Sequence, residues 1–247
     1  MDVIAIVSRK GGVGKTATAQ ALGAGLIKKK KKVLFIDLDS QTNLSYGLGA
    51  DTSGPNSMDL LTGEATAEEV IQKTAQGDAI AGTEALAGAD AIIDGTGKEY
   101  RLKEAISGLQ YDYIIIDTPA QLGTLTVNAL TAATSTIIPL QADIYSLQGI
   151  GQLNKTIEAV KKYCNKDLYI RGILITRYNG RAVISKDMQS NLEEVARQLN
   201  TRLYKTPIRE CIAVKEAQAS QTDIFSYSSK SNAAKDYIDF IKEFMKG

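Results

Sequence analysis

The stretch that decides the fold is residues 3–16, which read VIAIVSRKGGVGKT. The apolar run at residues 3–7 is typical of a buried strand, and it leads through glycines into an alanine-rich segment typical of a helix. Glycines let the backbone close around phosphate oxygens, and the first amides of a helix attract anions. The order of strand, glycine loop and helix therefore predicts a P-loop, which holds the phosphates of a nucleotide.

Two side chains of this loop have predicted roles. We expect the Lys15 ammonium to hold the β- and γ-phosphates and the Thr16 hydroxyl to bind Mg²⁺. The backbone amides of residues 12–16 are expected to point at the phosphates. An incidental glycine turn is the alternative interpretation, and the strand before the loop and the helix after it argue against that alternative.

Aspartates follow two further apolar runs. Asp37 and Asp39 come after residues 33–36, and Asp117 comes directly after residues 113–116. Carboxylates at the carboxyl ends of parallel strands lie beside such a loop, where Asp117 would hold Mg²⁺ through water. The alternative role for Asp39 is to cap the next helix. The chain has no histidine, so phosphoryl transfer would depend on positioning and on neutralising phosphate charge.

The remaining pattern predicts an α/β fold, with a doubly wound, mostly parallel sheet and helices on both faces. Short apolar runs at residues 113–116, 136–139 and 170–175 suit central strands covered on both faces. Residues 51–110 show weaker periodicity, and we expect short helices and loops around one strand there. A length of 247 residues is compatible with one large core, so residues 1–247 are expected to form a single P-loop ATPase domain.

The composition is that of a globular protein, with 44% hydrophobic and 23% charged residues. We find no apolar run of about eighteen residues and no signal-peptide pattern, so we expect a cytoplasmic protein that does not span a membrane. A net charge of +1 means that any affinity for nucleic acid would come from a local basic patch. Cys164 and Cys211 are far apart, which favours two reduced thiols over a zinc site or a disulfide.

Two segments each have two interpretations. Residues 28–32 are five consecutive lysines, which favour a solvated helix end over a nucleic-acid contact. Residues 232–245 form a helical pattern that places several apolar residues near one face: Tyr237, Ile238, Ile241, Phe244 and Met245. Packing of this helix in the core is favoured over its binding to a membrane.

Lys10 distinguishes this loop from an ordinary P-loop, which would have a glycine at residue 9, where this chain has arginine. The loop resembles the deviant Walker A box of the ParA/MinD family. That resemblance implies that Lys10 reaches across a dimer to the nucleotide of the other subunit. It also implies that Asp39, in a segment similar to the family's DxDPQ motif, positions and polarises the attacking water, although Ser40 replaces the usual proline.

The resemblance extends almost from end to end, and the last third is similar to ParA-type partition ATPases. By that resemblance, Pro207 and Arg209 line the adenine, and Asn179 approaches it. The catalytic set is then Lys10, Lys15 and Asp39, and the metal set is Thr16, Asp39 and Asp117. The predicted nucleotide-binding residues are Lys10, Gly11, Gly12, Val13, Gly14, Lys15, Thr16, Ala17, Asn179, Pro207 and Arg209.

The resemblance implies an ATPase that is slow alone, forms an ATP-dependent homodimer with Mg²⁺, and binds DNA without sequence preference. A ParB-like partner would stimulate it, and the protein would associate with the nucleoid. Candidate DNA contacts are Arg181, Lys186, Arg202, Lys205, Arg209, Lys215 and Lys235. The alternative is a MinD-like, membrane-associated positioning ATPase anchored by residues 232–247, a segment whose acidic and basic residues are nearly balanced and therefore favour anionic lipid little.

Overall fold

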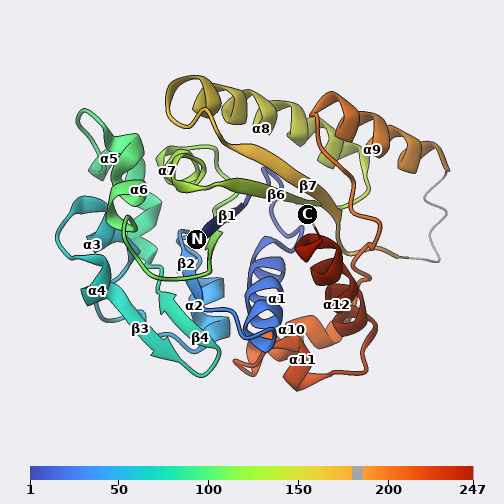
Figure 1. The fold of residues 1–247 in the computed structure, drawn as a ribbon, viewed down its shortest axis with the longest axis horizontal. Helices are drawn as coiled ribbons and strands as arrows, with labels where there is room; N and C mark the ends of the chain where they lie inside the picture. The colour runs from blue at the N-terminus through green and yellow to red at the C-terminus, as the bar shows by residue number, and fades with distance from the viewer. Residues whose placement is uncertain (180–185, 247) are drawn as a thin grey trace.

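The structure is a computed structural model that describes residues 1–179 and 186–246, with the side chains of residues 144–148 and 186–190 excluded. Figure 1 shows a layered arrangement of helices around a twisted sheet. The strands are β1 Asp2–Ile6, β2 Val33–Asp37, β3 Ile71–Thr74, β4 Gly77–Ile80, β5 Tyr113–Asp117, β6 Ser135–Leu140 and β7 Tyr169–Ile175. The helices are α1 Lys15–Lys28, α2 Asn43–Leu48, α3 Ser57–Thr62, α4 Ala67–Val70, α5 Ala89–Ile92, α6 Arg101–Ala105, α7 Thr124–Ala132, α8 Ile144–Tyr163, α9 Lys186–Gln198, α10 Ile212–Ala219, α11 Ile224–Tyr227 and α12 Asn232–Met245, with short 3₁₀ turns at Glu84–Gly88 and Lys98–Tyr100.

The described strands form one sheet in the order β3-β4-β2-β5-β1-β6-β7. All neighbouring pairs run parallel except β3 and β4, which are antiparallel. Strand β1 lies inside the sheet between β5 and β6, so the loop after β1 emerges within the carboxyl edge and away from its ends. In an open α/β sheet this edge, where successive crossovers leave for opposite faces, is where ligands bind.

Alternation along β1 explains the two layers of helices. Val3 and Ala5 belong to a core that includes residues of α3, α6, α7, α8 and α9. Ile4 and Ile6 point to the other face, into a core that includes residues of α1, α2, α10, α11 and α12. Figure 1 shows α8 and α9 along one side of the sheet and α1 and α12 along the other. The predicted doubly wound, mostly parallel fold is therefore confirmed.

The prediction for residues 51–110 is wrong in one respect, because this segment contains two strands, β3 and β4, where we expected one. Each strand has only four residues, and most of their side chains are exposed or half-buried. Such short strands, one at the edge of the sheet and one next to it, lack the apolar run that marks a central strand. Their pairing, which joins residues 71–74 to residues 77–80 through a two-residue turn, became evident only in the folded chain.

Helix α12 packs in the core. Its buried face includes Tyr237, Ile241 and Phe244, as the pattern predicted, and also Phe240. Ile238 and Met245 are each 41% exposed, so these two side chains lie off the buried face. The apolar surface that a membrane anchor would need is thus already used against α1 and the sheet.

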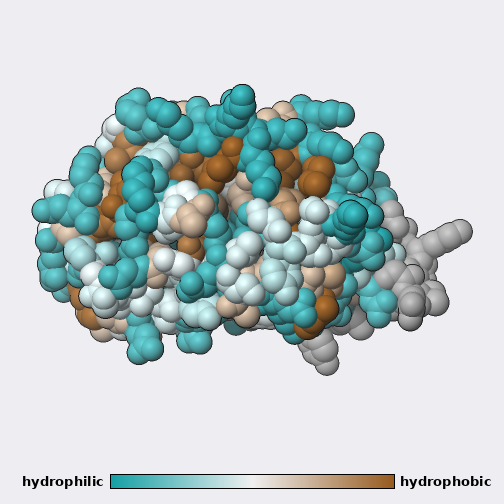
Figure 2. Space-filling view, turned by 90° about the horizontal axis from the view of Figure 1, so that it is seen from below, coloured by the Kyte–Doolittle hydropathy of each residue, from teal (hydrophilic) through white to brown (hydrophobic). Residues whose placement is uncertain are grey.

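No described helix is long and apolar enough to cross a membrane. On the face that Figure 2 shows, hydrophilic side chains project over most of the surface, and apolar residues are visible in small patches between them.

Candidate nucleotide site at the carboxyl edge of the sheet

The loop between β1 and α1 turns through two glycines in the left-handed region, Gly12 at φ 72° and Gly14 at φ 86°. A Cβ on Gly14 would lie 3.9 Å from the Thr176 Cβ, so conformation and not space requires glycine there. Helix α1 begins at Lys15, directly after Gly14, and no side chain caps its first amides. Uncapped amides at a helix start are the groups that bind an anion.

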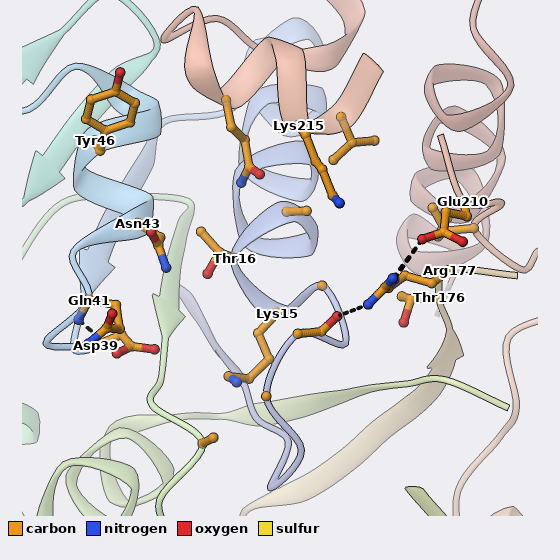
Figure 3. Close-up of a pocket in the computed structure, with 18 of the residues that line it drawn as sticks. Lys15, Thr16, Asp39, Gln41, Asn43, Tyr46, Thr176, Arg177, Glu210 and Lys215 are labelled. Atoms are coloured by element: carbon orange, nitrogen blue, oxygen red, sulfur yellow. Dashed lines mark hydrogen bonds and ion pairs between the residues drawn. The ribbon is translucent and has the colours of Figure 1, made fainter. Parts of the chain in front are cut away.

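This loop forms one wall of a pocket of about 790 Å³. Lys15 is only 7% exposed, and it makes no ion pair with any described residue. Figure 3 shows its amine extending toward the side of the pocket where Asp39 lies. A buried ammonium without a carboxylate partner fits a phosphate. The predicted residues that line the pocket are Gly11, Gly12, Gly14, Lys15, Thr16, Ala17, Asp39 and Arg209.

Val13 does not line the pocket, because its side chain is fully buried. Its backbone carbonyl instead accepts a hydrogen bond from the Thr176 hydroxyl at 2.5 Å. The same hydroxyl also donates to the Leu140 carbonyl at 3.1 Å. Thr176 therefore ties the loop to the ends of β6 and β7. The role of Val13 is to hold the loop in place through its backbone carbonyl.

Asp117, at the end of β5, lies beneath the loop and is fully buried. The Thr16 hydroxyl donates to Asp117 Oδ2 at 2.6 Å, while Asp117 Oδ1 has no hydrogen-bond partner. Burial, reinforced by the charge of Asp37, raises the pKa of Asp117 to about 8. An unpartnered carboxylate oxygen beside a threonine hydroxyl fits a divalent cation, which would restore the ionised form.

Asp37 and Asp39 have different surroundings. Asp37 is buried and accepts three hydrogen bonds, from the Ser45 amide (2.9 Å), the Ser45 hydroxyl (2.7 Å) and the Asp39 amide (3.0 Å). Burial raises the pKa of Asp37 to about 6, although the Ser45 hydrogen bonds oppose the shift. Asp37 thus braces the loop that presents Asp39 to the pocket. Asp39 Oδ1 accepts from the Gln41 amide, before α2 begins at Asn43, so Asp39 is not the cap of that helix.

Lys10 lies at the mouth of the loop and does not line the pocket of its own chain. Its ammonium pairs with Asp143 Oδ2 at 2.5 Å, just beyond the end of β6. Both side chains are about one-third exposed. Within one chain, therefore, the structure does not bring Lys10 into the pocket that Lys15 lines.

The far end of the pocket contains one of the three residues expected at the adenine. Arg209 lines it, but its guanidinium is held by Asp236 through Nε (2.8 Å) and Nη2 (2.6 Å). Ile208, buried, lines it as well. Among the described residues that form the wall, Pro207 and Asn179 are absent. Their contact with adenine stays a prediction.

Sequence reasoning did not assign several residues of this pocket to a nucleotide site, among them Arg177, Tyr46 and Lys215, the last of which was expected only as a DNA contact. Arg177 donates to the Gly12 carbonyl at 3.1 Å and to Glu210 at 2.8 Å, closing one side of the loop (Figure 3). Arg177 follows the carboxyl end of β7. Polar residues at the carboxyl ends of parallel strands were the signal that predicted the aspartates, and the same signal applies to Arg177. Tyr46 from α2 and Lys215 from α10 approach from the opposite rim (Figure 3), and no sequence motif marks either of them.

The basic residues predicted to contact DNA have varied surroundings. Lys215 lines the nucleotide pocket, Arg209 is paired with Asp236, and Arg202 stacks 4.6 Å above the centre of the Tyr204 ring. These three have roles within the chain. Lys205 and Lys235 are exposed, whereas Arg181 and the side chain of Lys186 lie outside the described residues.

The fold and this loop define a P-loop nucleoside triphosphatase. A family model described as an AAA domain matches residues 1–170. The chain is 39% identical to the sporulation initiation inhibitor protein Soj of Bacillus subtilis, over 98% of this chain and 97% of the relative. It is 35% identical to the chromosome partitioning protein ParA of Myxococcus xanthus, over 99% of this chain and 88% of the relative. The chain belongs to the ParA/Soj family of P-loop ATPases.

Solved structures agree with this assignment of the fold. A structure of cobyrinic acid a,c-diamide synthase from Mycobacterium smegmatis with bound ADP and magnesium superposes with a TM-score of 0.83. It is 32% identical to this chain, and the match covers 100% of this chain and 94% of the other. The nucleotide and the metal in that protein show that this fold accommodates both together.

Proposed function

We propose that this protein is a DNA-segregation ATPase that dimerises on ATP, binds DNA without sequence preference and is stimulated by a ParB-like, centromere-binding partner. The observation that carries the proposal is the placement of Lys10. Its ammonium lies on Asp143 and outside the pocket of its own chain, at the mouth of the phosphate loop. A lysine so placed is available to a second nucleotide, one that a facing subunit would bring.

The nucleotide is ATP with Mg²⁺. The uncapped amides of α1 and the Lys15 ammonium, which lines the pocket, would hold the phosphates. Thr16 and Asp117 would hold the metal, which supplies neutralisation of charge on the transferring phosphoryl group when it is bound. Asp39, presented to the same pocket, would orient the attacking water.

Hydrolysis by one chain alone would be slow, because the described pocket wall contains Asp39 but not the Lys10 of its own chain. The arrival of Lys10 from a facing subunit would add positive charge where it develops on the phosphates. Dimerisation would require Lys10 to leave Asp143, in a pair whose side chains are about one-third exposed and whose strength is therefore modest. A partner that stabilises the closed dimer would therefore accelerate turnover and, after hydrolysis, the release of DNA.

DNA binding in this proposal depends on contacts of lysine and arginine with phosphates, because the net charge is only +1 and a local patch must supply the attraction. The exposed candidates among those predicted are Lys205 and Lys235. Contacts of this kind carry no base information, which agrees with binding that is independent of sequence. They also place the protein on the nucleoid within the cytoplasm.

The test uses Asp39→Ala protein, in which hydrolysis is blocked and the closed dimer accumulates. Its binding to a duplex of arbitrary sequence is measured with ATP and Mg²⁺ and again with ADP and Mg²⁺, over a series of salt concentrations. We expect binding with ATP only, weakening steeply as salt rises. Equal binding with both nucleotides, or none with either when nucleotide occupancy is confirmed, would contradict the proposal.

A membrane-positioning ATPase was the alternative interpretation. The burial of Tyr237, Ile241 and Phe244 against the rest of the chain weighs against an anchor at α12. Co-sedimentation with anionic liposomes that required ATP and disappeared on deletion of residues 232–247 would favour this alternative instead.

A further inference from the structure

A second hollow lies at the amino edge of the sheet, away from the nucleotide pocket. It has a volume of about 540 Å³, and the residues around it come from the end of α1, the start of β2 and the β3–β4 hairpin. Three lysines line it, Lys31, Lys32 and Lys73, together with Asp78 and Tyr111. We call this hollow, with the adjoining exposed Lys29 and Lys30, the lysine groove.

The acidic group in the lysine groove is already engaged. Asp78 Oδ2 lies 2.6 Å from the Lys73 ammonium and accepts a hydrogen bond from the Tyr111 hydroxyl, also at 2.6 Å. Asp112 accepts from the backbone amide of Lys32 at 2.8 Å. No ion pair is formed by the side chains of residues 29–32 with any part of the chain that the structure describes. The groove therefore has an excess of positive charge.

A helix end does not account for these lysines. Cations are favoured in the last turn of a helix, and this effect falls off within that turn. Helix α1 ends at Lys28, which is the basic residue of its last turn and lies 3.9 Å from Asp223. The carbonyls of Gly25, Leu26 and Ile27 are already satisfied by the amides that follow. Residues 29–32 lie beyond the helix and are not needed to complete it.

We infer that the lysine groove is a contact surface for the phosphate backbone of DNA. This inference rests on the proposed function, and it adds a surface that differs from the basic residues considered there. Lysine ammonium groups on flexible stems suit phosphates met in any register, which is what binding without sequence preference requires.

The chemistry of the groove favours DNA over two other kinds of partner, a protein and a membrane surface. Protein interfaces are depleted in lysine and enriched in aromatic residues and arginine, whereas the charged lining here is lysine and Asp78. A membrane surface would need apolar side chains to insert, and no large hydrophobic residue lining the groove in the described chain is exposed. Phosphate contacts alone, by contrast, need only charge and access.

The position of the groove separates DNA binding from nucleotide binding. Helix α1 has 14 residues, so its two ends are about 20 Å apart. A dimer that closes over the nucleotides would leave both lysine grooves accessible, one on each subunit. Two linked sites bind one polymer more tightly than one site does, which would make DNA binding depend on ATP without any change within the groove.

The test compares variants in the Asp39→Ala background with ATP and Mg²⁺ on a duplex of arbitrary sequence. Lys31→Gln/Lys32→Gln removes two charges from the groove. Its matched control, Lys155→Gln/Lys166→Gln, removes two exposed charges on and after α8, which packs on the opposite face of the sheet. The rescue, Lys31→Arg/Lys32→Arg, retains the charge. Thermal unfolding and nucleotide occupancy are checked for every variant.

We expect the glutamine pair in the groove to bind DNA at least tenfold more weakly at about 0.1 M salt, with a shallower salt dependence, since each lost phosphate contact removes about 0.9 from the slope of log K against log salt. The control and the arginine pair should bind like the Asp39→Ala parent. Groove variants that bind like the parent, or a control that loses as much, would overturn the inference while the proposed function stands. A parent that does not bind DNA with ATP would overturn both.

Discussion

The two ends of α1 would bind phosphate by different physical means. At its start, two glycines in left-handed conformations and a lysine that is only 7% exposed form an enclosed site. At its end, lysines extend from the surface around an open groove. The first site selects by shape, because backbone amides must meet particular oxygens; the second selects only by charge. The same helix can therefore serve a specific small ligand and a polymer without register.

The largest expected effect is on ATP hydrolysis, and it should distinguish the two ends of α1. Lys15→Ala should lower kcat/KM for ATP hydrolysis at least about hundredfold, because one preorganised charge on the phosphates is typically worth that much. Steady-state hydrolysis and nucleotide titration measure it. Lys28→Ala, at the other end of the helix, is the matched control and should hydrolyse ATP normally. Activity within threefold of the parent for Lys15→Ala would mean that the backbone amides suffice.

Both ends of α1 depend on close packing of this helix against the sheet. A Cβ on Gly23 would lie 2.1 Å from Phe35 Cε1, inside the buried interface of α1 and β2. Gly23→Ala should therefore destabilise the protein by about 1–3 kcal/mol despite its better helix propensity. Urea unfolding measures this.

Gly151→Ala is the control for Gly23→Ala. Gly151 lies in α8, where a Cβ would meet nothing within 4 Å. That substitution should be neutral or stabilising by up to about 1 kcal/mol. If both glycine variants were stabilised alike, the tight seating of α1 would be wrong.

The buried carboxyl of Asp117, beside the start of α1, should lower the stability of the protein by an amount that depends on pH. Since the pKa of Asp117 is raised to about 8 from 3.8, the folded chain holds more protons than the unfolded chain between about pH 4 and 8. Stability of the ligand-free protein should therefore fall as pH rises through that window. Asp117→Asn should be more stable than the parent at pH 8, by about 1 kcal/mol or more, yet inactive.

Thermal unfolding at several pH values measures this difference. The gap between Asp117→Asn and the parent should narrow toward pH 4, and Mg²⁺ with nucleotide should stabilise the parent but not the variant. A gap that does not change with pH would exclude the buried carboxyl as its source.

The smallest effect on stability is expected at the carboxyl end of α1, where Lys28 lies on the surface. Lys28 lies 3.9 Å from Asp223, and its side chain is 49% exposed. Lys28→Ala should change the free energy of unfolding by no more than about 0.5 kcal/mol. Urea titration at low and high salt would show it, and a loss above 1 kcal/mol would mean that this end, too, is structurally demanding.

Much of the nucleotide site could be predicted from short-range pattern. The glycine loop with Lys15 and Thr16 is contiguous, and its strand and helix flank it directly. Asp39 and Asp117 follow strand ends, and parallel strands bring those ends together. Arg177 obeys the same rule and was overlooked. Tyr46 and Lys215 come from helices whose position relative to the loop depends on packing, so no local pattern could have indicated them.

The sequence by itself determined the loop chemistry, the order of elements and the doubly wound class, because these depend on glycine conformation and on apolar periodicity over a few residues. Only the tertiary structure decided that Lys10 lies on Asp143, that Arg209 is held by Asp236, and that lysines after α1 meet the β3–β4 hairpin to form a groove. Each of these depends on segments far apart in the chain, whose separation is set by side-chain packing across the whole fold.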